Sequence, residues 1–328
     1  MSTRNALLRL LSDGQFHSGT LLGQALGVSR AAVCKTIKSL GEAGVDIHRV
    51  SGRGYRLEQA FAPLDRSSIL AGIQRLAPTP GLALEVLEET DSTSTHLLQG
   101  GMDDSHGRVC LAEAQREGRG RRGRRWVATP WRNILLSMAW RFEQGPAALA
   151  GLSLAAGVAA VRALQAYGVS GVGLKWPNDL LWRERKLAGL LVDIRGEAAG
   201  PCCAVLGLGL NVQLDARDAA AIDQPWVDLH TALNQTIDRN RLAALLIHHF
   251  REMFRRFESD GLAAFRDDWE AHHRYARQRV SLMQGDTRID GRVHGIDDSG
   301  ALLIRDASGE LRRFHSGEIS LREAVSSP

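Results

Sequence analysis

The chain has few of the residues that cross-link secreted proteins or bind structural metals. Four of its 328 residues are cysteines: Cys34, Cys110, Cys202 and Cys203. Their spacing fits no metal-ligand pattern, and the adjacent pair is poorly placed for a mutual disulfide. We therefore expect reduced thiols with a structural role.

Long apolar runs and a large excess of one charge are also missing. No stretch approaches the roughly 20 apolar residues of a membrane span, and the N-terminus lacks the apolar core of a signal peptide. The net charge of +4 does not by itself indicate nucleic acid. We expect a cytoplasmic protein with no membrane partner. With 44% hydrophobic and 24% charged residues the chain is globular, and its length fits two or three domains.

Arginine and glycine, in contrast, are concentrated in one segment. Residues 118–126 read Gly-Arg-Gly-Arg-Arg-Gly-Arg-Arg-Trp, between apolar segments 109–114 and 134–140 that we expect to be buried strands. Glycine lets the backbone approach a phosphate, and guanidinium groups bind carboxylate or phosphate oxygens in pairs. The pattern favours an anion-binding loop. A solvated surface, a nucleic-acid patch and a disordered RNA-binding tract are the alternatives.

Residues 1–62 have the pattern of a winged helix-turn-helix domain. Two short amphipathic segments, 6–11 and 20–26, precede Ser29, which is a natural N-cap for a basic helix running to about Leu40. Two short strands then flank Ser51-Gly-Arg-Gly54, as in the wing of such a domain. A three-helix core with incidental basic residues is the alternative, because the pattern is common. The expected DNA contacts are Ser18, Ser29, Arg30, Ala31, Lys35, Lys38 and Arg53.

The rest of the chain mixes strands and helices without strict alternation, which favours α+β over a doubly wound sheet. Residues 61–68 read as a linker, and 276–324 as a small barrel of short strands. The boundaries we expect are 1–62, 66–275 and 276–324. The expected central strands are 82–88, 109–114, 134–140, 173–176, 186–194 and 204–208, and the expected helices are 147–166, 239–258 and 262–275.

Three further motifs in the central block suggest a binding site. Lys175-Trp-Pro-Asn-Asp179 places a cation and two polar side chains at the end of a strand, although such a sequence is more often a turn. The segment 89–94 brings hydroxyls to the start of a helix, where plain N-capping is the alternative. Gly207-Leu-Gly-Leu-Asn211 lets a ligand approach the backbone and offers an amide.

In order and spacing, these motifs resemble those of the bifunctional biotin protein ligases that also repress the biotin operon. The resemblance spans nearly the whole chain and implies a winged helix, a catalytic domain with a mixed sheet and an SH3-like barrel. It implies a ligase that joins the carboxylate of biotin to the α-phosphate of ATP with Mg²⁺, then passes biotin to a lysine of the biotin carboxyl carrier protein of acetyl-CoA carboxylase. It also implies that biotinyl-5'-AMP favours a homodimer that binds the biotin operator.

The first step brings an anion against a polyanion, so it needs positive charge more than a base. By similarity, the catalytic residues are Lys175, Arg119 and Arg121. The biotin contacts are Ser92, Thr93, Ser94, Gln115, Gly118, Arg119, Gly120, Arg121, Lys175 and Gly189. The nucleotide contacts are Arg121, Arg122, Arg124, Trp126, Lys175, Asn178, Asn211, Trp226 and Arg322, and Asn178 and Asp179 would place Mg²⁺-bound phosphates.

One residue departs from the family pattern. Ser94 stands where the family often has asparagine, which makes its contact with biotin doubtful. Three other functions remain open from the sequence: a lipoate or octanoyl ligase, a ligase without repressor activity, and a transcription factor that senses the ligand without turnover.

Overall fold

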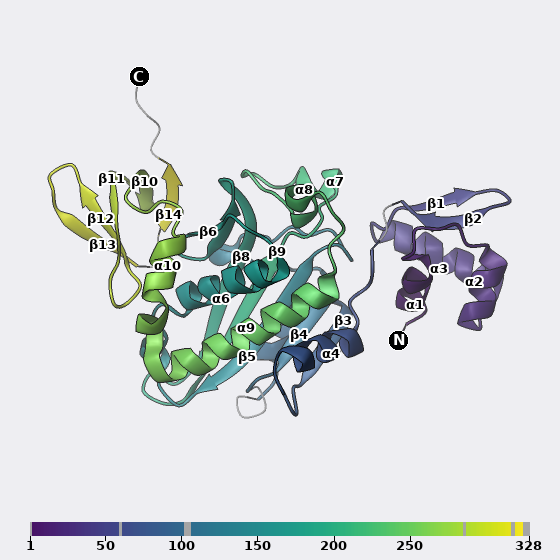
Figure 1. The fold of residues 1–328 in the computed structure, drawn as a ribbon, viewed down its shortest axis with the longest axis horizontal. Coiled ribbons are helices and arrows are strands. Elements are labelled where there is room, and N and C mark those ends of the chain that lie inside the picture. The colour runs from purple at the N-terminus through teal and green to yellow at the C-terminus, as the bar shows by residue number, and fades with distance from the viewer. Residues whose placement is uncertain (1, 59–60, 102–105, 285–286, 316–318, 324–328) are drawn as a thin grey trace, which may run out of the picture.

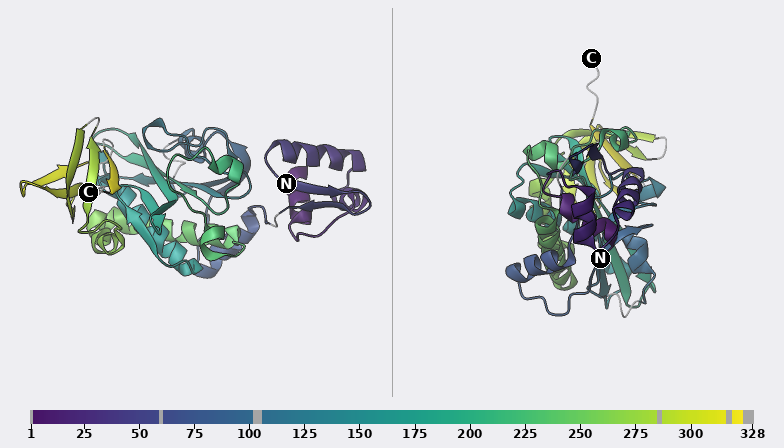
Figure 2. Two further views of the ribbon diagram at one scale, coloured as in Figure 1. Left: turned by 90° about the horizontal axis from the view of Figure 1, so that it is seen from above. Right: turned by 90° about the vertical axis from the view of Figure 1, so that its right-hand side faces the viewer.

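The computed structural model describes residues 2–58, 61–101, 106–284, 287–315 and 319–323. Figure 1 shows an N-terminal helical domain with a small hairpin, a central sheet covered by helices, and a C-terminal set of strands. Seen from above, the same three parts lie in a row along the long axis (Figure 2, left). This confirms the α+β multidomain fold.

The N-terminal domain contains the predicted winged helix-turn-helix. Ser2, Ser18 and Ser29 each accept a hydrogen bond from the backbone N–H three residues ahead, and these bonds fix the start of each helix. Val33 and Leu40 are buried as expected, whereas Ile37 is half-buried and packs on the edge of the same cluster. The elements are α1 (Thr3–Leu11), α2 (Gly19–Leu26), α3 (Arg30–Glu42), β1 (Ile47–Val50) and β2 (Gly54–Leu57).

The predicted linker 61–68 is too long. Asp65 accepts from the backbone N–H of Ser68 and caps α4 (Arg66–Leu76), a helix that the sequence reading missed. A Cβ on Gly72 would lie 2.8 Å from the Cβ of Ala244, so α4 packs closely against the long helix α9 (Arg239–Asp260). This tertiary contact helps to stabilise so short a helix.

The N-terminal domain is docked against the central domain. Trp131 of the central domain is 3% exposed and packs in the hydrophobic cluster of the N-terminal domain, and its indole Nε1 donates to Asn5 at 3.3 Å. The connecting segment is held as well, because the buried pair of Arg239 and Glu113, 2.7 Å apart, bonds to the backbone of Ala62 and Leu64. Apolar packing and a buried ion pair therefore fix the junction.

A seven-stranded mixed sheet forms the central domain. Its strand order is β3-β4-β5-β9-β8-β7-β6; β3 and β4 pair in parallel, and the other neighbouring pairs are antiparallel. All six expected strands are present, but β7 was missed because four residues between two tight turns give no readable period. The strands are β3 (Leu84–Thr90), β4 (Val109–Gln115), β5 (Ile134–Phe142), β6 (Val172–Lys175), β7 (Asp179–Trp182), β8 (Arg185–Gly196) and β9 (Cys202–Leu210).

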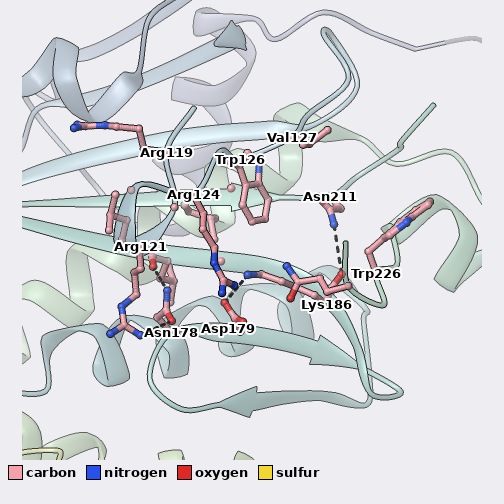
Figure 3. A pocket seen from close by; sticks show the side chains of 18 of the residues that line it. Arg119, Arg121, Arg124, Trp126, Val127, Asn178, Asp179, Lys186, Asn211 and Trp226 are labelled. Atoms are coloured by element: carbon pink, nitrogen blue, oxygen red, sulfur yellow. Dashed lines mark hydrogen bonds and ion pairs between the residues drawn. The ribbon is translucent and has the colours of Figure 1, made fainter. Parts of the chain in front are cut away.

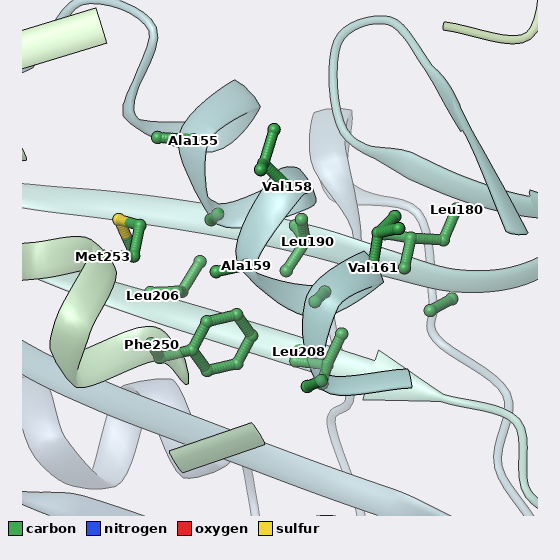
Figure 4. Packing of buried hydrophobic residues seen from close by; sticks show 14 of the residues in the cluster. Ala155, Val158, Ala159, Val161, Leu180, Leu190, Leu206, Leu208, Phe250 and Met253 are labelled. Carbon is green, nitrogen blue, oxygen red and sulfur yellow. The ribbon is translucent and has the colours of Figure 1, made fainter. Parts of the chain in front are cut away.

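Helices α6 (Leu152–Tyr167) and α9 cover one face of the sheet. Figure 4 shows residues of α6 and α9, among them Val158 and Phe250, interdigitating with Leu206 and Leu208 of β9. The other helical elements are α5 (Thr93–Leu98), η2 (Arg121–Gly123), η3 (Pro146–Leu149), α7 (Ala216–Ala219), α8 (Leu229–Leu233), η4 (Gly261–Phe265) and α10 (Arg266–His272).

Two helix predictions and one prediction about apolar runs need correction. The expected helix 147–166 is interrupted at Gly151, and the expected helix 262–275 is a 3₁₀ turn followed by α10, which ends before Tyr275. By length and composition the stretch 146–167 could span a membrane. Eleven of the sixteen residues of α6 are buried, so the apolar character of this stretch is explained by its place in the core.

The C-terminal domain is a five-stranded antiparallel sheet of order β13-β12-β11-β10-β14. It contacts the central domain through a buried hydrogen bond, in which the indole Nε1 of Trp176 donates to the carbonyl of Gly300 at 3.0 Å. The strands are β10 (Arg279–Gln284), β11 (Thr287–Ile296), β12 (Leu302–Asp306), β13 (Leu311–Phe314) and β14 (Ile319–Glu323). The four cysteines are free thiols, as expected.

Candidate active site

A cavity of about 930 Å³ lies at one end of the central sheet. It is lined by the start of α5, the arginine loop 119–127, the turn between β6 and β7, the first half of β8, the end of β9, and the segment 221–226. Figure 3 shows side chains from these separate segments converging on one space. Segments more than 100 residues apart therefore contribute to a single site.

Four hydroxyl groups and an amide gather at the α5 end of the cavity. Ser92 caps α5, while Thr93 Oγ1 and Ser94 Oγ lie 2.7 and 2.9 Å from Ser137 Oγ on β5. Gln115 accepts from both the backbone N–H and the hydroxyl of Thr93, at 2.7 and 3.0 Å. Buried hydroxyls in such a network suit a small ligand that both donates and accepts hydrogen bonds.

Glycines on β8 and β9 leave room for the indole of Trp126. A Cβ on Gly209 would lie 2.3 Å from this ring, and a Cβ on Gly189 would lie 3.0 Å from it. The indole Nε1 is buried and has no hydrogen-bond partner among the described residues. A flat aromatic surface with an unused donor therefore borders the cavity.

The arginine loop folds back on itself beside this ring. Gly118 accepts from the backbone N–H of Trp126 at 2.8 Å, and the N–H of Gly120 donates to Arg124 at 2.7 Å. Between them, Arg122 adopts a left-handed conformation with φ of 58°. These bonds give the loop a defined shape while its side chains remain directed to the cavity or to solvent.

Arg121 is the most buried cation of this loop. Its Nη1 donates to Asn178 Oδ1 at 3.3 Å, whereas its Nη2 is buried and lacks a hydrogen-bond partner among the described residues (Figure 3). Burial lowers the pKa of the Arg121 guanidinium, and neighbouring Arg122 lowers it further. A half-buried cation with a buried, unpaired N–H group is stabilised by an anion in the cavity.

The turn between β6 and β7 supplies both signs of charge. Lys175 ends β6, a cis Trp176–Pro177 bond follows, and Asp179 begins β7. Asp179 Oδ1 lies 2.8 Å from the ammonium of Lys186 at the start of β8, and this ammonium lies 5.6 Å from the centre of the Trp126 ring. Basic side chains thus lie close to the carboxylate of Asp179, which lines the cavity together with Glu184 and Asp223.

Asn211 and Trp226 lie at the opposite end from the hydroxyls. The amide of Asn211 donates to the carbonyls of Val227 and Lys186, at 3.2 and 3.4 Å, and so holds the segment that carries Trp226 against β8. Trp226 is half-buried and lines the cavity. The side-chain N–H groups of Asn211 are therefore already used in hydrogen bonds that hold the protein together.

Most of the predicted site residues line this cavity. Those that do are Ser92, Thr93, Ser94, Gln115, Arg119, Gly120, Arg121, Arg122, Arg124, Trp126, Lys175, Asn178, Asp179, Gly189, Asn211 and Trp226. Gly118 is absent from the lining and instead closes the base of the loop. Arg322 pairs through its backbone with Ser281, but its side chain lies outside the described residues.

The sequence reading missed several lining residues, of which Ser137 and Lys186 are the clearest. Lys186 carried a signal, since it follows the Lys-Trp-Pro-Asn-Asp motif at the start of an apolar strand. Ser137 carried none, because a serine inside an apolar strand is identified only when its neighbours in the sheet are known. Among the described residues, no cluster of three His, Cys, Asp or Glu side chains is placed to bind a metal ion.

The predicted DNA contacts form a separate group on the N-terminal domain. Arg30, Ala31, Lys35 and Lys38 are exposed along α3, and Arg53 is exposed on the loop between β1 and β2. Ser18 and Ser29 cap α2 and α3. An exposed basic helix beside an exposed hairpin arginine is the arrangement expected of a DNA-binding winged helix.

Comparison with known proteins assigns each domain. Residues 86–211 match the biotin/lipoate A/B protein ligase family, 3–56 match a helix-turn-helix domain, and 278–322 match the biotin protein ligase C-terminal domain. The chain is 41% identical to the bifunctional ligase/repressor BirA of Escherichia coli (strain K12) over 318 residues, 97% of each chain. It is 27% identical to BirA of Bacillus subtilis (strain 168), over 97% of this chain and 98% of the relative.

The solved structures include a similar enzyme. The biotin protein ligase from Aquifex aeolicus in complex with biotin and ATP superposes with a TM-score of 0.62 at 26% identity, over 74% of this chain and 99% of that chain.

Proposed function

Because the chain belongs to the family of bifunctional biotin protein ligases and biotin operon repressors, we propose that its cavity binds biotin and ATP next to each other. The observation that carries this proposal is Arg121, a half-buried guanidinium whose Nη2 is buried and unused, between a cluster of hydroxyls and an aromatic surface. That arrangement suits a neutral polar head at one end and the phosphates of a nucleotide at the other.

Biotin occupies the end lined by Ser92, Thr93, Ser94 and Gln115. Their hydroxyls and amide can both donate and accept, as the cyclic urea of biotin requires. Ser137 joins this set through its bonds to Thr93 and Ser94. Gly120 and Gly189 lie farther along the cavity, and Gly118 shapes the loop beside it.

ATP occupies the basic end. Trp126 and Trp226 offer aromatic surfaces for adenine, while Arg121, Arg122, Arg124 and Lys175 offer positive charge for the phosphates. The biotin carboxylate attacks the α-phosphate and expels pyrophosphate. Arg121 and Lys175 act by stabilising the negative charge that builds up between carboxylate and phosphate.

Arg119 stands apart from that charge. Its Nη2 donates to Thr95 Oγ1 at 2.9 Å and lies 3.8 Å from the carboxylate of Asp193. Arg119 therefore ties the loop to α5 and β8, and its effect on catalysis comes from holding the loop in place. Asn211 likewise positions the Trp226 segment.

Mg²⁺ fits this site when it arrives with the phosphates. Mg²⁺ is usually held by one or two carboxylates together with phosphate oxygens and water, and Asp179 supplies one carboxylate while Asn178 supplies an amide oxygen. The present partner of Asp179 is Lys186, which can move its charge to a phosphate. When bound, Mg²⁺ would neutralise phosphate charge and orient the leaving pyrophosphate.

The second half-reaction transfers biotin from biotinyl-5'-AMP to a lysine of the biotin carboxyl carrier protein of acetyl-CoA carboxylase. A relative that is 33% identical over 229 residues, from Paracoccus denitrificans, has the name biotin--[acetyl-CoA-carboxylase] ligase. For this activity we place the domain boundaries near 1–62, 66–275 and 276–324. The free thiols suit a protein that works in a reducing cytoplasm.

Repression follows from a homodimer that forms when the adenylate is bound. The adenylate phosphate provides Arg121 with an anion and orders the loop, which biases the chain toward the dimeric state. Two winged helices then bind the biotin operator. Sedimentation with and without biotinyl-5'-AMP tests this coupling, and an unchanged monomer would contradict it.

The role of Arg121 is tested by adenylate retention. Arg121→Ala should release biotinyl-5'-AMP roughly 10²-fold faster or more, as expected for loss of a charged hydrogen-bond partner. The matched control is Arg183→Ala, since Arg183 is exposed and stacks on Trp182 outside the cavity lining. Equal retention by both variants would contradict the assignment.

A further inference from the structure

Phe16, in the segment between α1 and α2, lies against the hairpin of β1 and β2. The next residue, His17, exchanges two backbone hydrogen bonds of 2.9 Å with Tyr55 of β2. The two segments approach so closely that a Cβ on Gly54 would lie 2.0 Å from the carbonyl oxygen of His17. The hairpin and the start of α2 therefore form one rigid unit, and Phe16 is part of it.

Two arginines of the hairpin stack on the ring of Phe16. The guanidinium carbon of Arg53 lies 4.4 Å from the ring centre, and that of Arg56 lies 4.9 Å from it. Both distances are within the range of cation–π attraction. A half-buried phenylalanine that contacts two guanidinium groups therefore acts as a platform that limits their freedom.

Neither arginine of this pair is neutralised by a carboxylate among the described residues. Within the described part of the chain, neither Arg53 nor Arg56 forms an ion pair, and the Nε of Arg56 is buried without a hydrogen-bond partner. The nearby carboxylate of Asp13 instead pairs with His17 at 3.0 Å. Two like charges held on one ring repel each other, and a polyanion relieves that repulsion.

We propose that Phe16 is a positioning residue for DNA, whose ring holds Arg53 and Arg56 ready to bind backbone phosphates. The inference rests on the proposed DNA interface of α3 and Arg53, and it adds Arg56 and Phe16 to it. A guanidinium stacked through its flat face keeps its N–H edge free for phosphate oxygens. Holding the arginines in advance removes part of the entropy cost that each would otherwise bring to binding.

The test measures binding of the full chain, with biotin and ATP present, to a fluorescent 40-base-pair duplex of mixed sequence. Phe16→Leu should weaken binding roughly five- to thirtyfold, the effect of freeing two long side chains. The slope of log affinity against log salt concentration should stay at the wild-type value in Phe16→Leu, because both arginines still contact phosphates in the complex. Arg53→Met or Arg56→Met should each lower that slope by about 0.9. Phe16→Tyr should bind as the wild type does, since the aromatic face is kept.

A double-mutant cycle separates positioning from a general effect on the fold. In a chain that already carries Arg53→Met and Arg56→Met, Phe16→Leu should change the affinity less than twofold, because the ring has nothing left to hold. An equal loss in both backgrounds, or wild-type binding by Phe16→Leu, overturns the inference. A wild type that does not bind the duplex overturns the proposed DNA interface as well. Biotin-dependent exchange of pyrophosphate by each variant checks that the catalytic domain is intact.

Discussion

Replacing Gly209 by alanine should disable adenylation while leaving the chain folded. The new Cβ would lie 2.3, 2.6 and 2.7 Å from three atoms of the Trp126 indole, whereas carbon atoms in contact are separated by about 3.5–4.0 Å. The ring must therefore move by roughly 1 Å. Trp126 closes the arginine loop through its bond to Gly118, so the loop moves with it.

A shift of about 1 Å in a catalytic site can lower the rate by about 10²-fold, or about 3 kcal/mol of transition-state stabilisation. The measurement is biotin-dependent exchange of labelled pyrophosphate into ATP at saturating substrates. Overpacking should cost about 1–3 kcal/mol of unfolding free energy, which thermal denaturation reports separately.

The matched control for Gly209→Ala is Gly200→Ala. Gly200 lies in the turn between β8 and β9, and a Cβ there would meet no atom closer than 3.4 Å. This variant should exchange pyrophosphate at the wild-type rate. If Gly209→Ala is equally active, the close packing of Trp126 on β9 is irrelevant to adenylation and the reasoning fails.

Three further predictions follow from the domain junction, the metal position and a buried histidine. Trp131→Ala should make opening of the junction easier by about 3 kcal/mol, near a hundredfold, which the rate of proteolysis of segment 61–65 reports; Trp182→Ala should leave that rate unchanged. Asp179→Asn should raise the Mg²⁺ concentration for half-maximal exchange roughly tenfold or more, and an unchanged requirement would remove Asp179 from the metal site. Burial lowers the pKa of His273 from 6.5 to about 4, so the unfolded chain binds a proton there more readily than the folded chain does. The free energy of unfolding should therefore fall as the pH drops from 6.5 to 4, by about 2 kcal/mol at pH 5. His273→Leu should make this fall smaller.

Local signals in the sequence were sufficient to predict the features that depend on neighbouring residues. The serine that caps α3 and the lysine that ends β6 are properties of short segments, and the structure confirms them. The arginine loop between β4 and β5 could be predicted in the same way, because its apolar flanks are long enough to read as strands. The disordered-tract alternative is therefore wrong.

Features that depend on distant contacts could not be predicted in this way. Helix α4 depends on packing against α9, and β7 on pairing with its neighbours in the sheet. Trp131 looks like an ordinary loop residue until the fold buries it in another domain. Ser137 joins Thr93 and Ser94 only because the sheet brings β5 beside α5.

The hydroxyl at Ser94 illustrates the same limit. In the sequence, serine stands where the family often has asparagine, and this made a contact between residue 94 and biotin doubtful. In the structure Ser94 lines the cavity and lies 2.9 Å from Ser137, and a Cβ on Gly207 would come within 2.7 Å of its oxygen. Its small size fits a site in which the strand backbone comes close, which the sequence alone could not show.

The central claim is that one cavity activates biotin with ATP, and biotin-dependent exchange of labelled pyrophosphate into ATP tests it most directly. The account predicts exchange that requires biotin, is not supported by lipoate or octanoate, and falls at least 10²-fold in Arg121→Ala and Lys175→Ala but not in Arg183→Ala. Exchange with lipoate instead of biotin, or no exchange by a folded wild-type chain, would contradict it.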